Sequence, residues 1–129
     1  MSSRSKHPSS ASLSIDTTGE RGFVRLTDER SGRFVTRSFT LISTHERDGA
    51  LLRAVERACT ALGVDRCAIA AVDVVPGPGR FSAVRLGVVT ANALAQALSI
   101  PLSVRGTRTR LALPEYGSEP SITQRRADG

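Results

Sequence analysis

The sequence predicts an α/β fold, in which one mixed sheet carries two helices in the order β-β-β-α-β-α-β and an extended tail follows. At 129 residues the chain has room for one domain, or for one lobe of a larger fold. Polar and apolar residues alternate between short turns up to residue 40, as in an antiparallel meander. Apolar residues then recur every three to four positions over 51–62, as on one face of a helix. A nearly continuous apolar run over 68–75 is typical of a buried parallel strand.

The individual elements are bounded by turn and capping residues. The meander strands are predicted over residues 12–17, 23–27 and 33–40, separated by Gly-containing turns. Gly63 is a natural C-cap for the helix over 51–62. Ser82 is the expected N-cap of a second helix over 83–98, which Pro101 ends before a short strand at 102–104. A meander followed by such crossovers predicts one mixed sheet with helices packed on it.

The two ends differ from the central lobe, residues 12–104. Residues 1–11 are Ser-rich and lack the apolar core of a secretory signal, so a disordered leader is expected. Residues 105–129 are polar, rich in Arg and punctuated by Pro and Gly, and they predict an extended basic tail. Four apolar residues are expected to dock part of that tail: Leu111, Leu113, Tyr116 and Ile122. No apolar stretch reaches a membrane span without a break, so we expect a cytoplasmic protein with no membrane contact.

Charge and composition narrow the classes of partner and site. The formal net charge is +6 and the pI about 10.9, so acidic partners such as RNA are candidates. Aromatic residues form only 4% of the chain, which argues against a surface that stacks single-stranded bases. Cys59 and Cys67 form no CxxC pair and have no His cluster beside them, so no metal site is expected. Cys59 falls on the apolar helix face and is expected to be a small buried residue.

The segment Pro76-Gly77-Pro78-Gly79-Arg80 lies between a predicted strand and a predicted helix. Such a turn can direct backbone N–H groups and a helix N-terminus at an anion, and Arg80 adds a cation. The spacing fits neither the GxxxxGK[ST] phosphate loop nor GxGxxG. The simpler interpretation is a tight strand-to-helix turn, and composition favours it by roughly two to one.

The second helix has two apolar faces. One contains Val84, Val88, Ala91, Ala95 and Leu98, and the other contains Leu86, Val89, Ala93, Leu94 and Ala97. A surface helix needs only one such face, so a partner protein is expected to cover the second. Small residues every four positions, including Gly87, would let a partner helix approach closely. We expect the interface to use eight residues of the two helices: Leu51, Leu52, Val55, Val84, Gly87, Val88, Ala91 and Ala95. A homodimer would bury the same faces of the two helices.

Three carboxylates offer an enzymatic alternative. Asp16, Glu56 and Asp73 fall on the first strand, first helix and fourth strand, where an RNase H-like sheet can gather metal ions for phosphodiester cleavage. Against this, Glu56 lies on the polar helix face, where it can pair with Arg53 or Arg57. Asp73 in a buried strand needs a partner, which the tail arginines or an interface would supply.

The chain resembles the TsaB family, also called YeaZ. The resemblance rests on Ile15-Asp-Thr-Thr18, on a His45-containing segment before a Leu-rich helix, and on GPGRFSAVRLG, Gly77–Gly87. The family hallmark is GPGSFTGLRIG. Six residues match it directly: Gly77, Pro78, Gly79, Phe81, Arg85 and Gly87. Arg80, Ala83 and Pro76 depart from it, and only a tail is expected after residue 104, where the family has a second lobe.

This resemblance implies a fold and a function. The fold would be a single RNase H-like/actin-like (ASKHA) lobe, and a lone lobe should bind nucleotide poorly, so no cofactor is expected. The function would be that of a non-catalytic subunit, with no catalytic residues of its own. It would pair through its two helices with TsaD, which transfers threonylcarbamoyl to an adenosine beside the tRNA anticodon. A TsaE-like ATPase joins the pair, and tRNA is contacted indirectly. Two alternatives remain: the metal-dependent nuclease, and a basic module that binds RNA through the tail.

Overall fold

The computed structural model describes residues 11–41 and 44–116, with the backbone alone over 44–48. Its elements are β1 (Ala11–Asp16), β2 (Arg21–Asp28), β3 (Phe34–Thr40), α1 (Thr44–Leu62), a 3-10 turn (Arg66–Ala68), β4 (Ile69–Val75), α2 (Phe81–Leu98), β5 (Leu102–Val104) and β6 (Thr107–Thr109). The predicted α/β class and the order β-β-β-α-β-α-β are therefore confirmed, with β6 as an addition.

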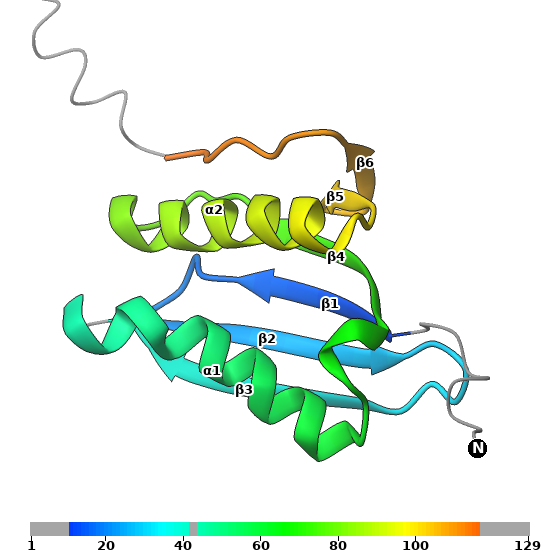
Figure 1. Ribbon diagram of the computed structural model, residues 1–129. Helices are drawn as coiled ribbons and strands as arrows, with labels where there is room; N and C mark the ends of the chain where they lie inside the picture. The colour runs from blue at the N-terminus through cyan, green and yellow to red at the C-terminus, as the bar shows by residue number, and fades with distance from the viewer. Residues whose placement is uncertain (1–10, 42–43, 117–129) are drawn as a thin grey trace, which may run out of the picture.

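The sheet has the order β3-β2-β1-β4-β5-β6. β1 pairs with β4 in parallel, and β4 pairs with β5 in parallel, while the remaining pairs are antiparallel. α1 packs along β2 and β3, and α2 packs mainly on β4 (Figure 1). The two helices therefore pack on different strands of the sheet.

One face of the sheet forms the core. In β1, Leu13 and Ile15 are buried, and their register partners Val72 and Val74 in β4 are buried with them. Side chains of both helices join this cluster, which shows that α1 and α2 cover the same face. On the opposite face lie Ser12, Ser14 and Asp16 of β1, which are only partly buried. Period-two alternation thus separates a helix-covered face from a polar one.

Two predicted helix boundaries were wrong. α1 begins at Thr44, because a polar first turn precedes the apolar face that starts near Ala50. α2 begins at Phe81 with Arg80 in the N-cap position, in extended backbone and with no capping hydrogen bond from its side chain. Ser82, the expected cap, is inside the first turn instead. The expected leader over 1–11 reaches one residue too far, since Ala11 is buried in β1, and its other residues lie outside the described range.

Candidate functional site

The loops that follow β1 and β4 meet at one edge of the sheet, because the carboxyl ends of adjacent parallel strands lie together. The loop after β4 is packed tightly on both sides. A Cβ added to Gly79 would lie 2.9 Å from the Thr18 Cα, and one added to Gly77 would overlap the Glu115 carbonyl oxygen. Gly77 has a φ of 139° and precedes a cis peptide bond to Pro78. The chain's own backbone thus fills the space beside these glycines, which favours a tight turn over an anion cradle.

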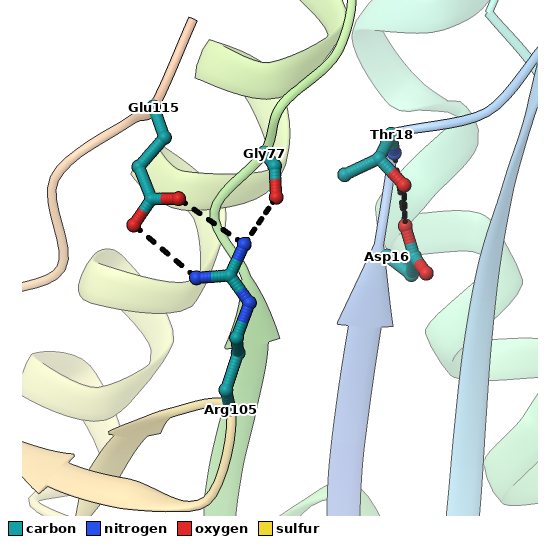
Figure 2. A network of polar contacts seen from close by, with 5 residues as sticks. All are labelled: Asp16, Thr18, Gly77, Arg105 and Glu115. Carbon is teal, nitrogen blue, oxygen red and sulfur yellow. Dashed lines mark hydrogen bonds and ion pairs between the residues drawn. The ribbon is translucent and has the colours of Figure 1, made fainter. Parts of the chain in front are cut away.

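Polar contacts fix both loops from within (Figure 2). After β1, a carboxylate oxygen of Asp16 accepts hydrogen bonds from the Thr18 backbone N–H at 2.9 Å and from its hydroxyl at 2.6 Å. After β4, Arg105 donates to the carbonyl oxygen of Gly77 and forms an ion pair with Glu115 at 3.1 Å. Asp16 therefore serves as the acceptor of an Asx turn. Arg105, expected in the extended tail, is part of the loop's support.

Residues 110–116, which we call the strap, return along α2 from β6 to the loop after β4 (Figure 1). The Asn92 side-chain amide donates to the Ala112 carbonyl oxygen at 3.0 Å and accepts from the Ala112 N–H at 2.9 Å. The Glu115 N–H donates to the Pro76 carbonyl oxygen at 2.7 Å. The Tyr116 ring stacks on Phe81, with centroids 4.4 Å apart. The strap closes over one side of α2 and reaches its N-terminus.

The expectation of an extended tail from residue 105 was therefore wrong as far as residue 116. β6 pairs with β5, and Ala112 is buried. Tyr116 docks as expected, whereas Leu111 and Leu113 are 58% and 66% exposed. Ile122 and the rest of 117–129 lie outside the described residues. The contact of Asn92 with the strap was not predicted, and its one signal in the sequence was a place in the narrow polar stripe of Arg85, Asn92 and Gln96 on α2.

Most of the expected partner interface lies in the core. The side chains of Leu51, Val55, Val84, Val88 and Ala91 are at most 3% exposed. Gly87 is also buried, and a Cβ there would lie 2.5 Å from the Thr17 hydroxyl oxygen. The missing side chain at Gly87 leaves room for Thr17 of the same chain and not for a partner helix. These six assignments were wrong because the sheet covers the faces of α1 and α2 that were expected to meet a partner. Leu52, at 50% exposure, and the partly buried Ala95 remain accessible.

The second apolar face of α2 is the one at the surface. Val89 is 58% exposed, Ala93 and Ala97 are exposed, and Leu86 and Leu94 are partly buried. We call these five residues the outer face of α2. Only 28% of α2 is buried within the protein. By length and composition alone α2 would also be long enough and apolar enough to cross a membrane, but a helix packed on a sheet meets the same test.

The three carboxylates of the nuclease alternative do not converge. Asp16 holds its own turn, and Asp73 accepts from the Ser103 hydroxyl at 2.6 Å and from the Gly106 N–H at 2.8 Å. Glu56 forms an ion pair with Arg66 at 3.2 Å. Within residues 11–41 and 44–116, no group of three His, Cys, Asp or Glu side chains is placed to hold a metal ion. The structure therefore contradicts the nuclease site, and the Asp73 partner lies in the β5–β6 hairpin.

The two thiols lie in different environments. Cys59 is buried in the core, as expected, and burial raises the pKa of its thiol. Cys67, in the 3-10 turn, is exposed. A raised pKa is the opposite of what a reactive cysteine needs, so Cys59 does not suggest nucleophilic chemistry.

Comparison with known proteins finds a family model and solved structures that are similar to this chain. Residues 43–105, from α1 to the end of β5, match the family model described as "TsaD: tRNA N6-adenosine threonylcarbamoyltransferase". The structure is similar to that of YeaZ from Pseudomonas aeruginosa, with a TM-score of 0.62 and 28% sequence identity over 74% of this chain. A second Pseudomonas aeruginosa structure, of an uncharacterized protein with similarity to peptidase YEAZ, matches with the same values.

The match covers 42% of the YeaZ chain, so this chain spans less than half the length of that protein. No curated protein matches the sequence. The implied RNase H-like/actin-like (ASKHA) lobe is confirmed by the shared fold. The match over residues 43–105 and the two solved structures together support the assignment of this chain to a TsaB/YeaZ-like family.

Proposed function

We propose that this protein works in the system that adds threonylcarbamoyl to adenosine in tRNA, as a non-catalytic subunit that binds a TsaD-like partner. The description of the matching family model and the likeness to YeaZ support a role in this modification system. In this proposal the transfer chemistry belongs to the partner, a TsaE-like ATPase joins the pair, and the location is cytoplasmic with the tRNA.

The uncovered outer face of α2 is the observation that carries the proposal. A soluble helix normally buries its apolar side and exposes a polar one. Here the inner side of α2 lies on the sheet, and Val89 and its neighbours present a second apolar surface. Leu52 of α1 is another large apolar side chain at the surface on the helix-covered side. Large apolar side chains left at the surface of a helix are typical of a site of protein association.

The test is co-purification with the TsaD-like protein of the same organism, followed by mass determination with light scattering. We expect a one-to-one complex that Val89→Glu weakens at least about tenfold, because the variant would bury an unpaired carboxylate. Leu111→Glu is the matched control, since Leu111 has the same 58% exposure but lies on the strap. Its complex should form as in the wild type.

Two results would count against the proposal. Wild-type affinity in the Val89→Glu variant would show that the outer face is not the interface. If the chain does not bind the TsaD-like protein and light scattering gives the mass of a dimer, then α2 forms a homodimer interface. This result would contradict the role of a heterodimeric subunit.

A further inference from the structure

A second surface lies at the other end of the sheet, where α1 crosses the edge strand β3. It is a hollow of about 550 Å³. Six residues line it: Arg37 from β3, and Arg53, Glu56, Arg57, Thr60 and Ala61 from α1. The five helical residues recur at spacings of three and four, so they lie on one face of α1. That face is separate from the buried one that contains Leu51 and Val55.

The charge in this hollow is strongly positive. Three guanidinium groups line it, and its one carboxylate, Glu56, forms an ion pair with Arg66 outside it. Arg37 donates to the Thr36 carbonyl oxygen at 2.9 Å, and Arg57 donates to the Ser38 carbonyl oxygen at 3.4 Å. Within the part of the chain that the structure describes, neither Arg37 nor Arg57 has a carboxylate partner.

These two hydrogen bonds orient the two arginine side chains and use only some of their N–H donors. A guanidinium group has five N–H donors in a fixed plane, and each of these side chains uses one on a β3 carbonyl. The remaining donors suit the paired oxygens of a phosphate group, which Arg binds in a bidentate manner. The bonds to β3 also hold the positive groups against the sheet edge, so less side-chain entropy is lost when an anion binds.

We propose that the hollow between α1 and β3 is a binding site for the phosphate backbone of RNA. The inference rests on the proposed function, which brings a tRNA to the complex, but it assigns direct contact to this subunit. With one tyrosine and no tryptophan in the chain, contact through phosphates fits the composition better than base stacking. β3 is at one end of the sheet and α2 packs on β4, so the RNA site and the outer face of α2 are separate surfaces.

The test is the fluorescence anisotropy of a labelled tRNA transcript titrated with the full chain over a range of salt concentrations. The variant replaces Arg37 and Arg57 with Gln. Its control replaces Arg108 and Arg110, which lie exposed in the β5–β6 hairpin and the strap, and removes the same charge. We expect the first double variant to lose at least about tenfold in affinity and to flatten the salt dependence by about 1.4 to 1.8 log units per log unit of salt, as for two phosphate contacts. The control should lose less than about threefold.

A further variant tests the geometry. Arg57→Lys keeps the charge but removes the planar fork, so affinity should fall several-fold while the salt dependence stays as in the wild type. This variant also covers the case in which the double substitution disturbs β3, which thermal unfolding of each variant would reveal.

Each other outcome overturns the inference. Equal losses in the two double variants would mean that net charge alone attracts RNA. No binding of tRNA by the wild type would exclude the site. Weaker binding of the TsaD-like protein with unchanged RNA binding would assign the hollow to an acidic protein surface. The two proposals fail separately, because Val89→Glu should lose the partner and keep RNA, whereas the variant at Arg37 and Arg57 should do the reverse.

Discussion

Gly87 offers a test of how α2 is seated on the sheet. A Cβ at this position would lie 2.5 Å from the Thr17 hydroxyl oxygen and 3.2 Å from its methyl carbon. Thr17 is fully buried, and its hydroxyl has no partner among the described residues, so the side chain has little room to turn. Replacing Gly by Ala inside a helix normally stabilises it by about 1 kcal/mol. Overpacking of this degree costs about 2–3 kcal/mol. Gly87→Ala should therefore lower the free energy of unfolding by about 1–2 kcal/mol, the difference between the two.

The effect of Gly87→Ala on the free energy of unfolding should change sign in a Thr17→Ala background. The hydroxyl and methyl groups are then gone, and the nearest remaining atom is the residue 17 Cβ at 3.4 Å, an ordinary contact. Only the helix-propensity gain of about 1 kcal/mol remains. The coupling energy between the two sites should thus be about 2–3 kcal/mol, the size expected for residues in direct contact.

Urea unfolding followed by circular dichroism, on the wild type, both single variants and the double variant, measures this coupling. The comparison uses only differences within each background, so the intrinsic effect of Thr17→Ala cancels. If Gly87→Ala shifts the midpoint by the same amount and in the same direction in both backgrounds, then Gly87 does not face Thr17 and the assigned inner face of α2 is refuted.

Three further predictions concern the strap and the thiols. Asn92→Ala removes both hydrogen bonds to Ala112 and should lower the free energy of unfolding by about 2 kcal/mol. Amide exchange at Ala112 should become faster, and the fluorescence of Tyr116 should be quenched more strongly. The control Gln96→Ala, one helical turn further along, should leave the exchange rate and the quenching unchanged. A thiol reagent should modify Cys67 quickly in the native protein and Cys59 only at the rate of unfolding, and equal rates would contradict the burial of Cys59. Burial raises the pKa of Cys59 above its ordinary value of 9.0, so the unfolded state ionises first, and stability should fall as the pH rises above about 9; a Cys59→Ala variant should lack this part of the decline.

The sequence predicted the elements well because their periodicity reflects burial. Leu13 and Ile15 alternate with serines because only one face of β1 meets the helices. The apolar run of β4 marks a central strand. Local composition is weaker at helix ends, where a polar first turn such as that of α1 resembles a loop.

The sequence did not determine which face of α2 meets the sheet. Its two faces are nearly equal in apolar content, so periodicity predicts that both exist but not which is inward. The choice depends on Thr17, which is far from Gly87 in the chain and fits only where a helix lacks a side chain. The strap was missed for a related reason, since the bonds between Asn92 and the Ala112 backbone join residues twenty positions apart and leave no repeating pattern.

The contact between Glu115 and Pro76 has a consequence for synthesis of the chain on the ribosome. The Pro76 carbonyl receives its hydrogen bond from a residue made much later, after α2, β5 and β6. Strands β1 to β3 pair with near neighbours in sequence and can form while the rest is being translated. The loop between β4 and α2 reaches its final set of contacts only after the strap has been made. A nascent chain that ends before Glu115 would therefore contain the sheet and both helices, but the loop between β4 and α2 would lack the hydrogen bond from Glu115.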